Sequence, residues 1–177
     1  MHDVAGTRHN VVPWRRFFAR NLDLAFAWLA FVLFMSIVNP AQFQNTSQLF
    51  LFMVAVILWV PIEVFCLSKF GTTPGKYILG LHLRRIDGQP IDVKAALDRS
   101  LSVWLKGLAI GAPLFNIFTY LTAYMDLDTK GTTEWDEELG YEVTYEPLER
   151  KMIAMYMGAF FGLYAGSFSV LILGQLI

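Results

Sequence analysis

The sequence predicts an all-α membrane protein with three to four transmembrane helices, one segment being broken or re-entrant, and a small cytoplasmic β-hairpin-like element. Of its 177 residues, 55% are hydrophobic and only 16% are charged, whereas a soluble domain carries about 25% charged residues. The apolar residues also gather in stretches long enough to cross a bilayer, which takes roughly 20 residues of helix. We therefore expect these apolar stretches to lie in the lipid bilayer.

Three apolar stretches have the length of a crossing helix, and they define the predicted spans: Phe17–Val38, Gln48–Leu67 and Met152–Leu176. A fourth apolar stretch, Leu101–Met125, is interrupted by Gly107, Gly111 and Pro113. Because proline removes a backbone donor and breaks or kinks a helix, this stretch is either a kinked span or a re-entrant hairpin.

Basic residues decide the predicted orientation, because Lys and Arg are enriched in cytoplasmic loops. Arginines precede the first span, the short loop Asn39–Ser47 has no Lys or Arg, and the loop over residues 68–100 is rich in both. We therefore expect a multi-pass protein whose N-terminus and 68–100 loop face the cytoplasm. If Leu101–Met125 is re-entrant, all 14 Lys and Arg are cytoplasmic, which favours that alternative.

Two short alternating segments outside the spans predict β-strands. Leu79–Arg84 alternates apolar with other residues and is followed by a turn signal, Asp87-Gly88. Asp92 can cap a helix that begins near Val93. Tyr141–Tyr145 also alternates. Since two lone strands are marginal unless they pair, we expect them to pair at the membrane surface, which places residue 141 in the cytoplasm.

Ionisable residues near the predicted spans mark the candidate functional site, because such residues are expensive in a membrane. Arg16 and Asp23 stand almost two helical turns apart, so their side chains share a face. Arg20 lies between them, and Glu63 lies near the cytoplasmic end of the second span. If these groups lie at the same depth in the membrane, they can bind a cation, relay protons or simply neutralise one another. Of the two carboxylates, Glu63 is the better candidate for a proton carrier.

A structural interpretation of these charges stays open beside the functional one. Arg20 and Asp23 have the spacing of an ordinary helix-surface pair, and Arg16 can reach lipid headgroups. A second open alternative concerns the last span, where Gly158, Gly162 and Gly166 recur at every fourth position. Such a pattern is typical of close helix packing, either with a partner chain or within one chain.

The block Gly71-Thr72-Thr73-Pro74-Gly75-Lys76 superficially suggests a phosphate loop. It is one residue short of that motif, has Tyr77 at the magnesium position and follows a predicted membrane helix instead of a strand. We interpret it as a tight turn that leaves the bilayer, with Lys76 near lipid phosphates.

The same block, followed by Leu79-Gly80-Leu81 and Asp87-Gly88, resembles the signature of the RDD family of small bacterial membrane proteins, named for one arginine and two aspartates. Arg16-Phe17-Phe18-Ala19 with Asp23 is similar to the family's first-span pattern. The resemblance implies a membrane domain over residues 1–147, with an additional C-terminal helix over 148–177.

The resemblance also implies which residues are characteristic. Arg16 and Asp23 correspond to the first arginine and aspartate, Arg99 to another recurrent arginine, and Asp136 to the second aspartate. Trp135 stands where the family usually has a histidine. The alternative for Asp136 is a solvated acidic loop. The corresponding loop-motif residues are Gly71, Thr73, Pro74, Gly75, Lys76 and Gly80.

The functional expectation is a small-ion or solute transporter in the bacterial cytoplasmic membrane, such as a cation/proton exchanger, that uses buried carboxylates. Sodium/proton exchange is the role that the resemblance suggests for some relatives. The alternative is a non-catalytic accessory or scaffold subunit of a larger membrane complex. We expect a homo-oligomer or other membrane subunits as partners, but no nucleic acid, because the net charge is −1. No cofactor, bound metal or enzymatic activity is expected.

Overall fold

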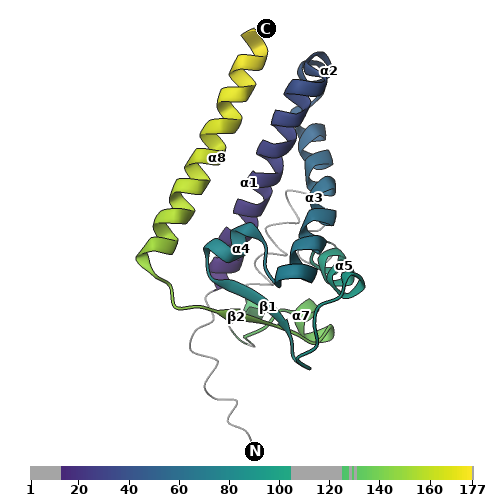
Figure 1. Ribbon diagram of the computed structural model, residues 1–177, viewed down its shortest axis with the longest axis vertical. Coiled ribbons are helices and arrows are strands. Elements are labelled where there is room, and N and C mark those ends of the chain that lie inside the picture. Colours follow the sequence, from purple (N-terminus) through teal and green to yellow (C-terminus); the bar gives the residue numbers. More distant parts are fainter. Residues whose placement is uncertain (1–12, 105–124, 128, 130, 177) are drawn as a thin grey trace, which may run out of the picture.

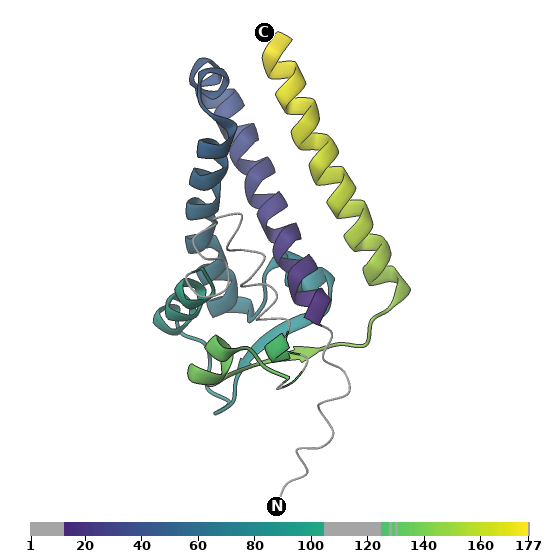
Figure 2. The ribbon, with the colours of Figure 1, turned by 180° about the vertical axis from the view of Figure 1, so that it is seen from behind.

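Three long helices form the body of the protein in a computed structural model, which describes residues 13–104, 125–127, 129 and 131–176. They are α1 (Pro13–Val38), α3 (Gln48–Phe70) and α8 (Arg150–Leu176), and α1 lies between the other two (Figure 1). Viewed from behind, a layer of short helices and strands covers the end of this body at which α1 begins (Figure 2).

The three predicted spans are confirmed as helices that are long and apolar enough to cross a membrane: Trp14–Val38, Gln48–Phe70 and Arg150–Val170. The second of them continues beyond the predicted end at Leu67. It ends at Phe70 and is capped by Gly71, whose left-handed backbone (φ 64°) lets its N–H bond to the Leu67 carbonyl. Most of the predicted fourth stretch, Leu101–Met125, lies outside the described residues.

The predicted loop Asn39–Ser47 contains a short helix, α2 (Pro40–Asn45), which the sequence interpretation missed. The Asn39 side chain accepts a hydrogen bond from the backbone N–H of Gln42 at 3.1 Å. Pro40 stands in the first turn, where a helix needs no backbone donor. Phe43 then buries its ring in an apolar cluster with Val32 and Leu51, which holds the α1–α3 connection compact.

In the described part of the chain, the covering layer includes two strands and three short helices whose bounds are defined. The helices are α4 (Pro74–Ile78), α5 (Val93–Ser102) and α7 (Glu134–Glu138), and the strands are β1 (Leu81–Arg85) and β2 (Tyr141–Tyr145). The strands pair antiparallel with Leu83 opposite Val143, as predicted, although β1 begins two residues later than expected. The turn at Gly88 (φ 72°) and the Asp92 cap, which accepts from the Ala95 N–H at 2.6 Å, are also confirmed.

Apolar contacts hold this layer against the long helices. Leu81 of β1 packs with Ala19 and Leu22 of α1 in one buried cluster. The next inward residue of β1, Leu83, packs with Leu67 of α3 in a second cluster. Because alternate residues of a strand point to the same face, the sheet presents one apolar face to α1 and α3, and charged residues lie at the junction.

Candidate functional site: a buried charge cluster

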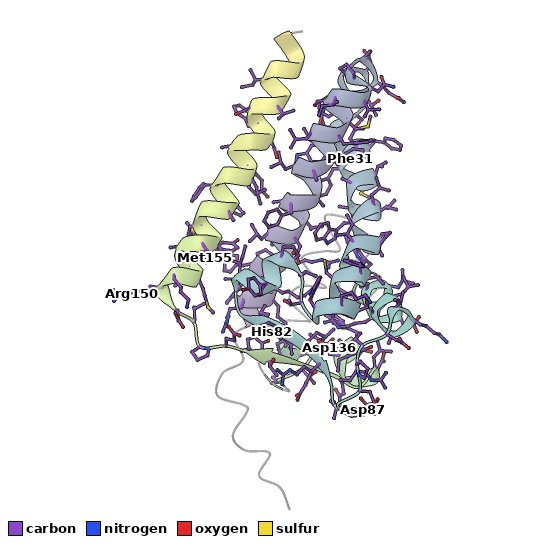
Figure 3. The ribbon with its side chains drawn as sticks, viewed as in Figure 1. Phe31, His82, Asp87, Asp136, Arg150 and Met155 are labelled. Atoms are coloured by element: carbon purple, nitrogen blue, oxygen red, sulfur yellow. The ribbon has the colours of Figure 1, made fainter. Side chains whose placement is uncertain are left out.

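Charged side chains from five elements meet where the covering layer joins the long helices. We call them the charge cluster, and its members are Arg16, Arg20 and Asp23 of α1, Glu63 of α3, Lys76 of α4, Arg99 of α5 and Asp136 of α7. The three carboxylates are fully buried. Asp136 is labelled in Figure 3, in the layer beneath the long helices.

Asp23 binds the loop motif. The Thr73 hydroxyl donates to Asp23 Oδ2 at 2.5 Å, and the Gly75 backbone N–H donates to Oδ1 at 2.7 Å. A Cβ atom at Gly75 would overlap the Ala19 carbonyl oxygen and stand 2.9 Å from Asp23 Oδ1, so only glycine lets the loop approach α1 this closely. The loop that resembles a phosphate loop thus holds a carboxylate of its own chain.

Glu63 binds two cations. Its Oε1 atom lies 2.6 Å from Arg20 Nη1 and 3.4 Å from Lys76 Nζ. Its Oε2 atom is buried without a hydrogen-bond partner in the described part of the chain. The expectation that Lys76 lies near lipid phosphates is therefore wrong: the Lys76 side chain points inward, to the buried carboxylate of Glu63. Burial lowers the pKa of Lys76, and Glu63 and Asp23 oppose that shift.

Asp136 is the meeting point of two arginines. Arg16 Nη1 lies 2.8 Å from Oδ2, Arg99 donates to Oδ1 at 2.9 Å, and the Thr133 hydroxyl donates to Oδ2 at 3.0 Å. Burial acts to raise the pKa of this carboxyl, but Arg99 and Arg16 outweigh it and hold the pKa below its usual range. The interpretation of Asp136 as part of a solvated loop is wrong.

Within the charge cluster, the residues that the sequence placed at one level fall into two groups of ion pairs. Arg20 meets Glu63 as proposed, whereas Arg16 reaches Asp136 and the Tyr145 hydroxyl (2.6 Å) instead of lipid headgroups. Arg20 and Asp23 are both buried, so they are not an exposed helix-surface pair. The spacing of Arg16 and Asp23 therefore identified residues of the site but not the partners of their side chains.

Arg15 is a buried residue whose contacts the sequence analysis missed. Its guanidinium donates to the Glu146 carbonyl at 2.8 Å and also to the Leu79 and Gly80 carbonyls. It thereby joins the start of α1 to the residues that flank both strands. Its position next to Arg16 in a basic run gave no signal, because such runs are also common beside membrane spans.

The family comparison agrees with this geometry. The model of the RDD family matches residues 11–137, a range that contains the whole charge cluster. The chain belongs to the RDD family. It is thus a membrane protein, as its three long apolar helices also indicate. The match ends before β2 and α8. No curated protein sequence and no solved structure matches the chain.

This RDD protein contains an internal repeat that the sequence analysis overlooked. Residues 71–85 and 131–145 both read Gly-Thr-Thr, five other residues, Leu-Gly and a strand, with an offset of 60 residues. Both begin with a glycine of positive φ (64° and 77°) and have a second one before the strand (62° and 69°). The signal was visible as Gly71-Thr72-Thr73 and Gly131-Thr132-Thr133.

Hydrogen bonds repeat with the same offset. The N–H of Glu146 donates to the Gly80 carbonyl at 2.9 Å, and the N–H of Ile86 donates to the Gly140 carbonyl at 3.0 Å. Exchanging the two copies turns each bond into the other. With Leu83 opposite Val143 at the middle of the ladder, the two copies are related by a local twofold axis.

The glycines of α8 divide into two groups. A Cβ at Gly166 would be in ordinary contact, 3.6 Å, with Leu29 of α1, so this glycine lies at the helix junction within the chain. Gly158 and Gly162 have no such neighbour within 4 Å in the described residues. The glycine pattern therefore serves intramolecular packing only in part.

Proposed function

We propose that this RDD protein transports a small ion or solute across the bacterial cytoplasmic membrane. The observation that carries the proposal is the environment of Glu63, which is fully buried within a candidate span and keeps one carboxylate oxygen without a hydrogen-bond partner in the described residues. A buried charge that served only to hold helices together would gain stability from satisfying every lone pair. An unsatisfied one is a reason to expect a ligand, a proton or water at that atom.

The internal repeat supports the same proposal. Many membrane transporters are built from structural repeats, with the substrate site where the repeats meet. Here the two copies bring Lys76 and Asp136 to the charge cluster, and α1 supplies residues to both copies. A displacement of one copy relative to the other would change the partners of Arg16, Arg20 and Glu63 together.

A cytoplasmic position for the charge cluster is part of the proposal. The pairing of β1 with β2 puts both copies of the repeat at the end where α1 begins (Figure 1). The basic residues before α1 and in the 68–100 loop favour the cytoplasm for that end.

Purified protein in proteoliposomes tests the proposal. Charge movement would be recorded on a solid-supported membrane after jumps in proton, sodium, potassium or chloride concentration. We expect Glu63→Gln to abolish or alter the response at equal amounts of folded protein, whereas the exposed Asp87→Asn control should match the parent. The absence of a response of the unaltered protein to every jump would refute transport of these ions.

The open face of α8 favours the oligomer or accessory-subunit hypothesis as a second candidate. Gly158 and Gly162 leave room for a neighbouring helix, because no side chain of the described residues fills the space beside them. Gly158→Leu with Gly162→Leu should then disrupt the native particle, as measured by native mass spectrometry from mild detergent. A particle of unchanged mass and composition would refute this use of the glycines.

A further inference from the structure

We infer that the charge cluster binds a small anion, an inference that rests on the proposed function and names its substrate class. The cluster has four cationic members, Arg16, Arg20, Lys76 and Arg99, and three anionic members, Asp23, Glu63 and Asp136. The formal charge of the whole cluster is therefore +1, and the excess positive charge belongs to the group of Arg16, Arg99 and Asp136. A bound anion would neutralise it.

Buried hydrogen-bond donors point to the same ligand chemistry. Side-chain atoms without a hydrogen-bond partner in the described residues include Nε1 of Trp59 and Trp104, Oγ of Ser100 and Oε2 of Glu63. The Ser100 side chain is fully buried and the Trp59 side chain is 5% exposed. Three of these four atoms can donate a hydrogen bond, so the described part of the site has more unused donors than acceptors.

Trp104 lies beside Arg20, and the other atoms lie on helix faces that they share with Trp104 or Glu63. Trp59 lies one helical turn before Glu63, and Ser100 lies one turn before Trp104, so each pair shares a helix face. The Trp104 ring lies 4.5 Å from the Arg20 guanidinium carbon, and Arg20 binds Glu63. Helices α3 and α5, which carry Trp59 and Ser100, are in contact with each other.

A cation is the poorer ligand for this site. Metal cations and sodium need several oxygen ligands. Both carboxylate oxygens of Asp23 already accept hydrogen bonds from Thr73 and Gly75, and both oxygens of Asp136 accept from its arginines. That leaves Glu63 Oε2 as the carboxylate oxygen without a partner among the described residues. Charge and donor supply therefore both favour an anion.

The inference predicts changes of opposite sign. Glu63 competes with the anion for Arg20 and Lys76, so Glu63→Gln should strengthen binding about tenfold, while Lys76→Gln should weaken it about tenfold. Ser100→Ala should weaken binding severalfold by removing one donor. Arg85→Gln, which removes a positive charge from an exposed ion pair with Asp87, should leave binding unchanged.

Isothermal titration calorimetry of the full-length protein in a neutral detergent measures these affinities. Bromide replaces gluconate, so the ionic strength stays constant. Saturable bromide binding with the stated changes is expected. No saturable binding, or weakening by both Glu63→Gln and Lys76→Gln, would overturn the inference. If Glu63→Gln does not fold, the bromide affinities of Ser100→Ala and Lys76→Gln are compared with that of the control Arg85→Gln. Affinities equal to that of the control would overturn the inference.

Two further measurements distinguish a lipid phosphate from a free anion, and the anion site from the transport proposal. Competition of phosphatidylglycerol with bromide would identify a lipid phosphate as the resident anion, whereas bromide binding unaffected by this lipid would identify a free anion. Anion binding without any ion flux would refute transport and leave the site. Flux without anion binding would refute the anion site and leave transport.

Discussion

Lys76 and Asp136 occupy the same position in the two copies of the repeat, yet they carry opposite charges and face opposite partners. Lys76 lies 3.4 Å from Glu63, and Asp136 lies 2.8 Å from Arg16. If the copies exchanged places, Lys76 would face Arg16 and Arg99, and like charges in close contact are costly. The charges thus favour the observed docking of each copy on the long helices over the exchanged one.

Gly75→Ala should destabilise the protein strongly. The new Cβ would overlap the Ala19 backbone and crowd Asp23 Oδ1, so α4 would have to move away from α1. We expect a loss of about 1–3 kcal/mol in the free energy of unfolding, measured by thermal unfolding in detergent. Gly158→Ala, in a helix with open space beside it, is the control and should be neutral or slightly stabilising. Equal unfolding temperatures for the two variants would contradict the proposed close approach.

Asp136→Asn should leave Arg16 and Arg99 buried without their counter-charge. Breaking a buried ion pair from one side costs about 3–5 kcal/mol, so the unfolding temperature should fall clearly. Asp87→Asn alters an exposed pair with Arg85 and serves as the matched control with little expected change. A parent-like unfolding temperature for Asp136→Asn would show that this carboxylate is dispensable for the docking of α7.

The stability contributed by Asp136 should depend on pH in a defined direction. Its pKa is held below the usual range by Arg99 and Arg16 against the effect of burial. The contribution is then fully present above the unfolded-state pKa of about 3.9 and is lost as pH falls through the lower folded-state value. The difference in unfolding temperature between the parent and Asp136→Asn should therefore be constant near neutral pH and shrink in acid. A difference that grows in acid would contradict this sign.

An oxidative cross-link should confirm the strand register in native membranes. Arg84 and Glu142 lie opposite each other and are both exposed, so Arg84→Cys with Glu142→Cys should form a disulfide in a Cys66→Ala background. Arg84→Cys with Glu146→Cys is the out-of-register control and should not. Mass spectrometry of the intact chain distinguishes these outcomes, and efficient cross-linking of the control would argue against a fixed register.

Cysteine labelling should determine the side of the membrane on which the charge cluster lies. Arg84→Cys, exposed on β1 of the covering layer, should react with a membrane-impermeant maleimide in inverted vesicles. Asn45→Cys, exposed in α2 at the other end of the long helices, should react in right-side-out cells. The reverse pattern would overturn the proposed cytoplasmic position of the N-terminus and sheet.

The spans, strands and caps were predictable because their causes are local. A membrane helix satisfies its own backbone within about 20 apolar residues, so the spans from Phe17, Gln48 and Met152 were visible in the sequence. Alternation in Tyr141–Tyr145 and the Asp92 cap depend on neighbouring residues in the same way. The repeat was equally visible at an offset of 60 residues. Its second copy is harder to recognise because the five residues between Gly-Thr-Thr and Leu-Gly differ from those of the first copy.

By itself, the sequence determined that charged residues are retained beside apolar spans, whereas only the tertiary structure decided which charges meet. Arg20 and Glu63 are 43 residues apart, and Arg16 and Asp136 are 120 residues apart. No local spacing rule reaches over such separations. The partner of each charge depends on how α1, the two copies of the repeat and the buried apolar face of the sheet pack together, because a buried charge takes whichever counter-charge that packing brings within hydrogen-bond distance.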